Sequence, residues 1–281
     1  MINQIKTVLL LGTLTGIFLV IGYFFAGTSG LTIALVIALA MNLITYFFSH
    51  KIVLFIYRAK EADKKKYANL YKDVKQVSEL ANLPMPKVYI VPTQTPNAFC
   101  TGRNPKNSIL AFTEGILELL NERELKGVIA HELSHVKNRD ILISTIAAVI
   151  AGAISYIAFM ARWGAIFGGG DRDKGGSSMI GLLLVGIITP IIALIIQLAI
   201  SRSREYLADN SGAKTIKDPN ALADALTKLH AGVKHNPLKL GSESTAHMFI
   251  VNPFTMKGVM SLLSTHPSLE SRVGRLRSMK V

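Results

Sequence analysis

Four long apolar runs constrain this chain more than any other feature, because about 20 apolar residues are enough to cross a bilayer. They cover residues 8–26, 31–50, 141–161 and 180–200, and none contains a charged side chain. The first run could also be read as a cleaved signal peptide, but its length and the second run directly after it favour an uncleaved anchor. We therefore expect four transmembrane helices.

The apolar runs divide the chain into four parts. Residues 1–50 are predicted to form an N-terminal transmembrane hairpin and residues 141–200 a second one. Residues 51–140 and 201–281 are then the two parts of one polar domain. Lysines and arginines directly after residue 50 place this domain on the cytoplasmic side by the positive-inside rule.

The strong positive charge of the chain suggests an anionic partner. The formal net charge is +13, but no basic cluster is interleaved with aromatic residues, as a nucleic-acid site would require. Basic segments beside apolar runs instead fit the anionic surface of a membrane leaflet. We therefore expect a lipid bilayer and no nucleic acid as partner.

The strongest chemical signal is the run His131-Glu-Leu-Ser-His135. Asn121 and Glu124 have the spacing of a capping box, which predicts a helix starting here. Helical spacing places both imidazoles on one face, where they can bind one zinc ion. Glu132 then stands where a base can take a proton from zinc-bound water. A solvated His–Glu surface pair is the alternative interpretation, so a third ligand decides between them.

A catalytic zinc site needs three protein ligands and one open position. Glu205, just after the fourth apolar run, is the candidate for the third ligand. Asp209 lies one helical turn further on, where it can accept the remaining N–H of a liganding histidine. A charged surface face is the alternative. A hairpin of the last two apolar runs would return Glu205 to the histidines, and this ligand set favours one Zn²⁺ per chain.

The predicted reaction is hydrolysis of a peptide bond. Glu132 acts as general base towards water and then as general acid towards the leaving amine. His247 and His266 are candidates for a hydrogen bond to the transition-state oxyanion, although a structural hydrogen bond is the simpler role for each.

A small sheet is predicted beside this helix. Residues 87–91, 97–101 and 108–113 are strand candidates, and such a sheet would offer an edge to an extended peptide. Asn97 is a candidate substrate contact on that edge, with a packed hairpin as the alternative. Cys100 is read as a small core or edge residue, because no motif places a base beside it.

With these motifs in place, the chain resembles the HtpX-type membrane zinc metalloproteases, which are related to the CAAX-processing prenyl-protein proteases. The resemblance rests on Asn97-Ala-Phe99, His131-Glu-Leu-Ser-His-Val-Lys-Asn-Arg-Asp140, Ser203-Arg-Glu-Tyr-Leu-Ala-Asp209 and Thr265-His-Pro-Ser-Leu-Glu-Ser-Arg272. It implies a cytoplasmic gluzincin domain with His131, His135 and Glu205 as zinc ligands and Glu132 as catalytic residue. It also implies a role in quality control of membrane proteins under stress.

We therefore expect a mainly α protein with a small β-sheet, four transmembrane helices and a cytoplasmic zincin-like (gluzincin) protease domain. It would reside in the bacterial cytoplasmic membrane and cleave cytoplasmic regions of misfolded or damaged membrane proteins. An intramembrane protease of the site-two class is one alternative, and a non-enzymatic scaffold that need not bind metal is another. Charged residues around the zinc motif argue against the first: Glu122, Glu124, Lys126, Lys137 and Arg139.

Overall fold

The structure of the chain is a computed structural model that forms two compact units. One comprises Met1–Thr45 and Ile143–Ile200, and we call it the apolar unit; the other comprises Tyr46–Leu142 and Ser201–Val281, and we call it the polar unit. The residues that the structure describes are 19–20, 22–24, 26–30, 32–37, 40, 48, 50–51, 53–102, 104–140, 143, 147, 151, 154–155, 158, 176–235, 250 and 266–281.

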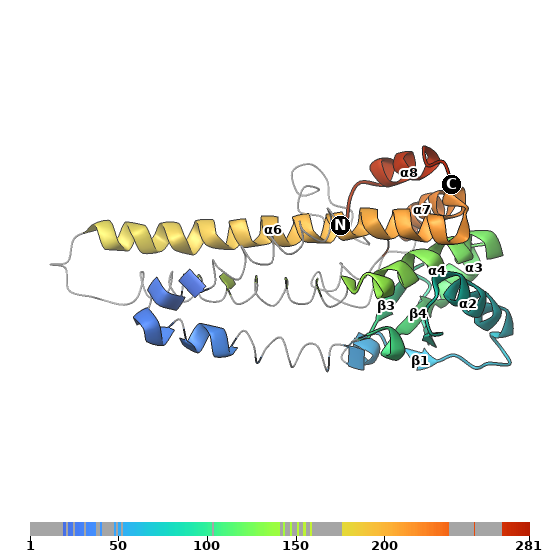
Figure 1. Ribbon diagram of the computed structural model, residues 1–281, viewed down its shortest axis with the longest axis horizontal. Coiled ribbons are helices and arrows are strands. Elements are labelled where there is room, and N and C mark those ends of the chain that lie inside the picture. The colour runs from blue at the N-terminus through green and yellow to red at the C-terminus, as the bar shows by residue number, and fades with distance from the viewer. Residues whose placement is uncertain are drawn as a thin grey trace. The chain divides into compact units, whose positions relative to one another are not determined.

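The longest element is helix α6, Gly176–Ile216, which carries the fourth apolar run and continues without a break into the polar segment behind it (Figure 1). Among the described residues, the part Gly186–Ile216 is the one helix long and apolar enough to cross a membrane. A shorter apolar helix covers Ala26–Ile37. The expectation of four transmembrane helices is thus not confirmed, since most of the first three runs lies outside the described residues.

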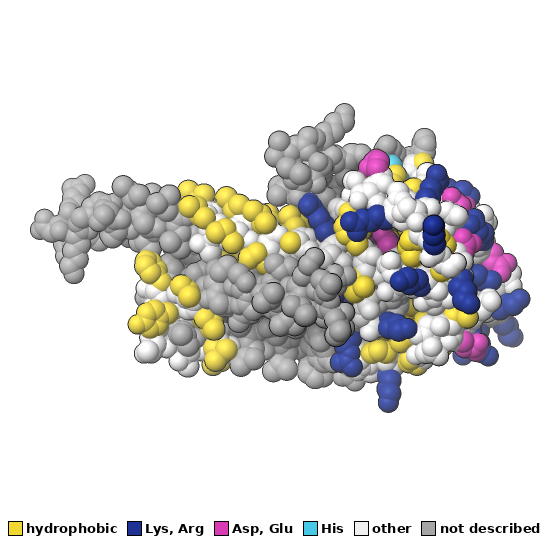
Figure 2. All heavy atoms as spheres, turned by 45° about the horizontal axis from the view of Figure 1, so that its top comes forward, with side chains coloured by type: hydrophobic (Ala, Val, Ile, Leu, Met, Phe, Trp, Pro, Cys, Tyr) yellow, Lys and Arg dark blue, Asp and Glu magenta, His cyan; other side chains and the backbone are white. Residues whose placement is uncertain are grey.

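The described part of the apolar unit exposes large aliphatic side chains, which appear yellow in Figure 2. Exposed isoleucines and leucines recur along α6 at Ile187, Ile188, Ile191, Ile192, Leu194 and Ile195. A contiguous apolar surface of this kind is unfavourable in water and suits contact with lipid or with other apolar helices. The membrane character predicted from composition therefore has a structural counterpart on α6.

The polar unit contains a four-stranded sheet in the order β1-β2-β4-β3. Its strands are β1 (Lys60–Glu61), β2 (Lys87–Val91), β3 (Ala98–Thr101) and β4 (Ile109–Thr113). Strand β4 pairs parallel with β2 and antiparallel with β3, so β3 forms one edge of the sheet. The three strands predicted from sequence are confirmed. Strand β1 was not predicted, because its two residues are too few to show an alternation of apolar and polar side chains.

The polar unit also contains helical segments with defined bounds. They are α2 (Ala68–Ala81), the 3₁₀ turn η1 (Pro105–Asn107), α3 (Glu114–Leu119), α4 (Glu122–Lys137), α7 (Pro219–His235) and α8 (Leu269–Arg277), together with the end of α6. A turn precedes α2, in which Asp63 accepts hydrogen bonds from the backbone N–H groups of Lys65 and Lys66. Helix α2 ends at Asn82, which adopts a left-handed conformation.

Helix α4 is central to the polar unit, since it contacts α2, α7 and strand β3. Two glycines allow neighbouring backbones to approach it closely. A Cβ on Gly127 would lie 2.7 Å from the backbone nitrogen of Leu222 in α7. A Cβ on Gly212 of α6 would lie 2.9 Å from the backbone nitrogen of His131. The end of α6 is thereby seated against α4 at the first histidine of the motif.

Candidate metal centre

The helix that carries the two histidines begins as the sequence predicts. The side chain of Asn121 accepts a hydrogen bond from the backbone N–H of Glu124, and the Glu124 carboxylate accepts one from the backbone N–H of Asn121. Both contacts together form a capping box, which satisfies two N–H groups that a helix start leaves unpaired. The apolar side chains along one stripe of α4 are buried: Leu125, Ile129, Leu133 and Val136.

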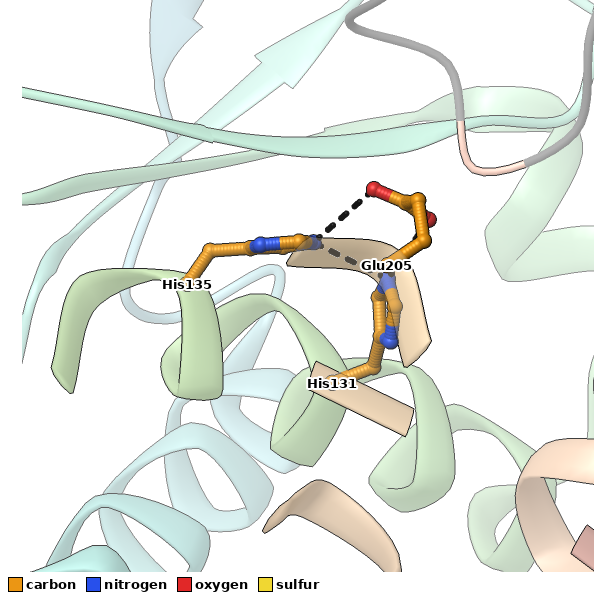
Figure 3. Close-up of side chains that lie close together, drawn as sticks. All are labelled: His131, His135 and Glu205. Carbon is orange, nitrogen blue, oxygen red and sulfur yellow. Dashed lines mark hydrogen bonds and ion pairs between the residues drawn. The ribbon is translucent and has the colours of Figure 1, made fainter. Parts of the chain in front are cut away.

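Three side chains from α4 and α6 converge on one point, as Figure 3 shows. Nε2 of His135 lies 3.1 Å from Nε2 of His131 and 3.4 Å from Oε1 of Glu205. Nε2 of His131 lies 3.6 Å from Oε2 of Glu205. The structure thus brings together the three residues that the sequence analysis offered as metal ligands, although 70 residues of chain and an apolar hairpin were expected between them.

These distances can be compared with those of a tetrahedral zinc site. Two nitrogens bound to zinc at 2.0–2.1 Å with a tetrahedral angle lie about 3.3 Å apart. The observed 3.1, 3.4 and 3.6 Å scatter around that value. In addition, Oε2 of Glu205 is buried and accepts no hydrogen bond among the described residues, although Arg272 lies within ion-pair distance of it. The donor set therefore fits a metal ion held by three protein ligands with a fourth position open.

The two facing imidazoles also need a proton or a metal ion between their Nε2 atoms. If both Nε2 atoms carried lone pairs, they would repel each other at 3.1 Å. Burial disfavours protonation of His135, but a hydrogen bond to Asp140 and the charge of Glu205 outweigh it and raise its pKa to about 9. The site therefore favours a cation at this point, either a proton or a metal ion.

Each histidine is held from behind by an aspartate. Nδ1 of His131 lies 3.0 Å from Oδ1 of Asp209, one turn after Glu205 on α6. Nδ1 of His135 lies 2.9 Å from Oδ2 of Asp140. Such contacts place the ring hydrogen on Nδ1 and leave Nε2 available to a metal. Sequence reasoning identified Asp209 for this role and missed Asp140, which returns to His135 because Arg139 adopts a left-handed conformation after α4.

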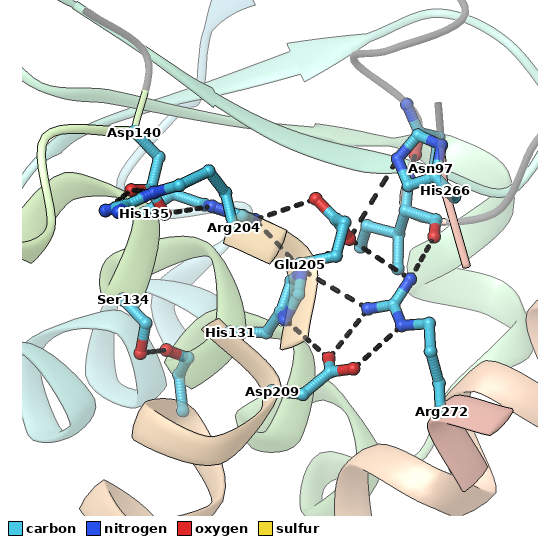
Figure 4. A network of polar contacts seen from close by, with 12 residues as sticks. Asn97, His131, Ser134, His135, Asp140, Arg204, Glu205, Asp209, His266 and Arg272 are labelled. Atoms are coloured by element: carbon cyan, nitrogen blue, oxygen red, sulfur yellow. Dashed lines mark hydrogen bonds and ion pairs between the residues drawn. The ribbon is translucent and has the colours of Figure 1, made fainter. Parts of the chain in front are cut away.

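Two buried arginines complete the network drawn in Figure 4. Arg204 pairs with Asp140 through Nε and Nη2. Arg272, from α8, pairs with Asp209 through Nε and Nη2 at 2.9 and 2.7 Å. Sequence reasoning missed both roles, since a lone arginine in a basic segment looks like a surface residue and its partner lies more than 60 positions away.

Glu132 follows the first histidine and is also buried, with 4% of its surface exposed. Burial raises the pKa of its carboxyl group, while the charges of His135 and His131 and a hydrogen bond from the Cys100 backbone oppose the rise. A carboxylate in this setting binds a proton more readily than one in water, which suits a general base. Burial also raises the pKa of the Cys100 thiol well above its ordinary value, so this residue is a core thiol and not a nucleophile.

The remaining candidates from the sequence lie beside the same centre or outside the described residues. Nε2 of His266 lies 4.0 Å from Oε2 of Glu205, and its side chain is buried. Asn97 is buried at the start of β3, where its Oδ1 accepts a hydrogen bond from the backbone N–H of Ile250. His247 lies outside the described residues.

Comparisons with known proteins agree with this geometry. Residues 64–280 match peptidase family M48. The chain is 52% identical over 277 residues to a protease HtpX homolog of Desulforapulum autotrophicum, which covers 98% of this chain and 89% of that protein. It is 50% identical over 275 residues to a protease HtpX homolog of Pyrococcus furiosus, which covers 98% of this chain and 95% of that protein.

A likeness to a solved structure supports the fold. The crystal structure of Ste24p from S. mikatae superimposes with a TM-score of 0.60 at 18% sequence identity. The match covers 98% of this chain, which spans 65% of the length of that protein. At this level of identity the likeness establishes a mostly helical fold with a small sheet, as the sequence analysis expected.

Proposed function

Because the chain belongs to peptidase family M48 and is a metalloprotease, we propose that it is a zinc-dependent endopeptidase embedded in the bacterial cytoplasmic membrane. We further propose that His131, His135 and Glu205 bind one Zn²⁺ and that Glu132 is the catalytic residue. One observation carries this proposal: ligand atoms of the three residues lie within 4.8 Å of one another on two packed helices.

The chemistry follows from the positions of the protein groups. A bound zinc ion would polarise the scissile carbonyl and lower the pKa of water at its open position to about 7. Glu132 takes one proton from the attacking water as the new C–O bond forms. The same carboxyl group then gives that proton to the leaving nitrogen as the C–N bond breaks. His266, whose imidazole lies beside Glu205, is positioned to donate a hydrogen bond to the oxyanion.

The edge strand β3 supports an extended polypeptide as the substrate. The backbone N–H of Thr113 donates to the carbonyl of Asn97 at 2.9 Å, so this carbonyl faces β4. Because peptide groups alternate along a strand, the backbone groups of Ala98 and Cys100 point away from β4, where the Cys100 N–H donates to Glu132. All four residues of β3 are buried, so a substrate segment can add as a further strand next to α4 only when this edge is uncovered. Folded substrates would first have to expose such a segment, which favours misfolded membrane proteins.

The polar unit is proposed to work in water on the cytoplasmic side. Glu122 and Arg123 at the start of α4 expose 68% and 51% of their side chains. Charged side chains exposed to hydrocarbon are costly, so this helix is unsuited to a lipid-facing position of the kind a site-two protease would need. Membership of a peptidase family also leaves a non-enzymatic scaffold without support.

The decisive experiment replaces Glu132 by Gln in the full-length protein. Zinc content should stay at one ion per chain, because the side chain is not a proposed ligand. Cleavage of a misfolded membrane protein with a cytoplasmic tail should fall by at least about a hundredfold, since general acid–base catalysis is worth that much. Both are measured on detergent-purified protein by metal analysis and by gel-based cleavage rates. Equal rates for the parent and Glu132→Gln would remove Glu132 from the mechanism.

A second variant tests the ligand set. Glu205→Ala should lower zinc stoichiometry or affinity, because two imidazoles and water hold zinc more weakly than a three-residue site. Metal analysis after dialysis against a weak chelator gives the readout. Unchanged stoichiometry and affinity would assign the third ligand to another residue. Parent protein that binds no zinc at all would refute the proposed function as a whole.

A further inference from the structure

The two aspartates behind the histidines are each held by a buried arginine, and this pairing is repeated on both sides of the metal centre. Arg204 and Arg272 expose 3% and 2% of their surface. Arg204 contacts Asp140, which contacts His135, while Arg272 contacts Asp209, which contacts His131. We call each arginine–aspartate–histidine series of contacts a relay, and Figure 4 shows both of them.

On the His135 side, the two oxygens of Asp140 have separate roles. Oδ2 lies 2.9 Å from Nδ1 of His135, and Oδ1 accepts from Nε and Nη2 of Arg204. Nη2 of Arg204 also donates to the backbone carbonyl of Asn138 at 3.1 Å. The arginine thereby fixes the carboxylate relative to the end of α4, and the carboxylate fixes the imidazole ring.

On the His131 side, Arg272 reaches two proposed ligands at once. Its Nη1 donates to the carbonyl of Ile250 at 2.8 Å and lies 3.2 Å from Oε2 of Glu205. Its Nη2 also lies 3.4 Å from Nε2 of His131. Every nitrogen of the guanidinium group therefore has a partner within the protein. A side chain occupied in this way acts on the site through its neighbours.

The formal charges around the centre are consistent with a divalent ion. Four buried carboxylates surround it, from Glu132, Asp140, Glu205 and Asp209. With both histidines neutral, the two arginines leave a formal charge of −2 among these described groups. One divalent cation neutralises that charge, whereas a site without the arginines would carry twice as much negative charge as the ion can balance.

We propose that Arg204 and Arg272 are positioning residues that orient the metal ligands by locking Asp140 and Asp209 against Nδ1 of the two histidines. The inference rests on the proposed zinc site and adds the arginines to it. Because a guanidinium group binds a carboxylate through two N–H groups in a fixed plane, it holds orientation as well as charge. A lysine keeps the charge but loses the planar fork.

A positioning role and a purely electrostatic role of the two arginines predict opposite changes in zinc affinity. Replacing Arg204 by Met removes a positive charge near the ion, so a purely electrostatic effect would tighten zinc binding. Loss of orientation would weaken it, and contacts behind a metal ligand are typically worth 10–100-fold in affinity. We expect Arg204→Met to raise the dissociation constant for Zn²⁺ by at least tenfold. Arg272→Met should raise it further, because this residue also contacts Glu205.

The experiment titrates purified full-length protein with Zn²⁺ against a chromophoric chelator and records the visible absorption of the Co²⁺-loaded form, which reports ligand geometry. Arg204→Lys should show an intermediate affinity and spectrum. The matched control is Arg123→Met, which removes an arginine that pairs with Asp218 and Asp224 on the exposed surface. It should retain the parent affinity and the parent spectrum.

A charge-matched variant covers the case in which Arg204→Met fails to fold. Asp140→Asn combined with Arg204→Met keeps the formal charge of the site while removing the ion pair. It should still bind Zn²⁺ at least tenfold more weakly than the parent and show an altered Co²⁺ spectrum. Tighter or unchanged zinc binding with an unchanged spectrum, in this variant or in the single ones, overturns the inference. Absence of zinc from the parent protein would instead refute the proposed function.

Discussion

The imidazoles of His131 and His135 face each other across 3.1 Å, a separation that is favourable when a proton or a metal ion lies between the two nitrogens. Their orientation does not come from α4 alone. Each ring is set by an aspartate and each aspartate by an arginine, so two buried side chains stand behind each histidine. Single residues far from the reacting atoms are therefore expected to affect metal binding, whereas residues that touch the substrate should affect turnover.

His266 provides a test of that division. Replacing it by Ala should lower kcat by about 10²–10³-fold, because it removes a donor to the oxyanion, while zinc affinity stays close to that of the parent. Steady-state kinetics on a peptide substrate and zinc titration give the two readouts. His230→Ala on α7 is a control that should change neither. A loss of zinc in His266→Ala with normal kcat on reloading would assign the residue to metal binding instead.

Sequence patterns identified the residues whose chemistry and spacing are characteristic of a metal site. They did not identify residues that belong to the site only because the fold brings them close to it. The histidine motif, Glu205 and Asp209 have fixed spacings on helices, so their convergence could be anticipated. Arg204 could not be recognised, because nothing in its neighbourhood distinguishes it from Arg202 two positions earlier. Arg272 stands within a motif whose resemblance was noted, but its pairing with Asp209 depends on how α8 packs. The contact between Asp140 and His135 depends on the left-handed conformation of Arg139, which the local sequence does not predict.

At the scale of elements, the metal centre depends on how closely the end of α6 approaches α4. Helix boundaries near the site were readable because capping residues mark them: Asn121 before α4 and Thr113 before α3 both accept hydrogen bonds from the first turn. The distance between α4 and α6 could not be predicted from sequence, because it depends on Gly212, whose lack of a side chain lets the two helices approach. The residues around Gly212 do not differ from those of other helices.

Gly212→Ala tests this contact. A methyl group would lie 2.9 Å from the backbone of Ala130 and His131, so α6 has to move away from α4 and carry Glu205 with it. We expect a lower melting temperature and weaker zinc binding, measured by calorimetry and chelator competition. Gly274→Ala is the matched control, since no atom lies within 4 Å of its added methyl group. Removing a helical glycine there should stabilise the protein by about 0.5–1 kcal/mol and leave zinc affinity unchanged.

At the scale of the whole molecule, most of the buried charged side chains described in the polar unit gather around the metal centre, with Asp73 and Glu124 as exceptions. The apolar core contains side chains of α4, α7 and the sheet. The carboxylates around the metal centre are compensated only in part by the two arginines. A divalent ion thus contributes to the stability of this unit as well as to its chemistry, because a ligand that binds only the folded state stabilises it.

Metal removal should therefore lower the melting temperature of the polar unit. At a free zinc concentration 100 times the dissociation constant, binding stabilises the folded state by about 2.7 kcal/mol. For a domain of this size, that corresponds to a shift of roughly 5–10 °C. Calorimetry with and without a chelator, followed by readdition of Zn²⁺, measures the shift. Identical melting temperatures in all three conditions would contradict a zinc site in this unit.

The residues that support the metal centre lie far apart in the chain, so the ribosome makes them at different times. Arg272 and His131 are 141 positions apart, and a ribosome adds about 5–20 residues per second. At that rate 141 residues take about 7–28 s, so the histidine helix is made well before the arginine that completes its supports. During that interval the growing chain already carries its general base but lacks a finished metal centre.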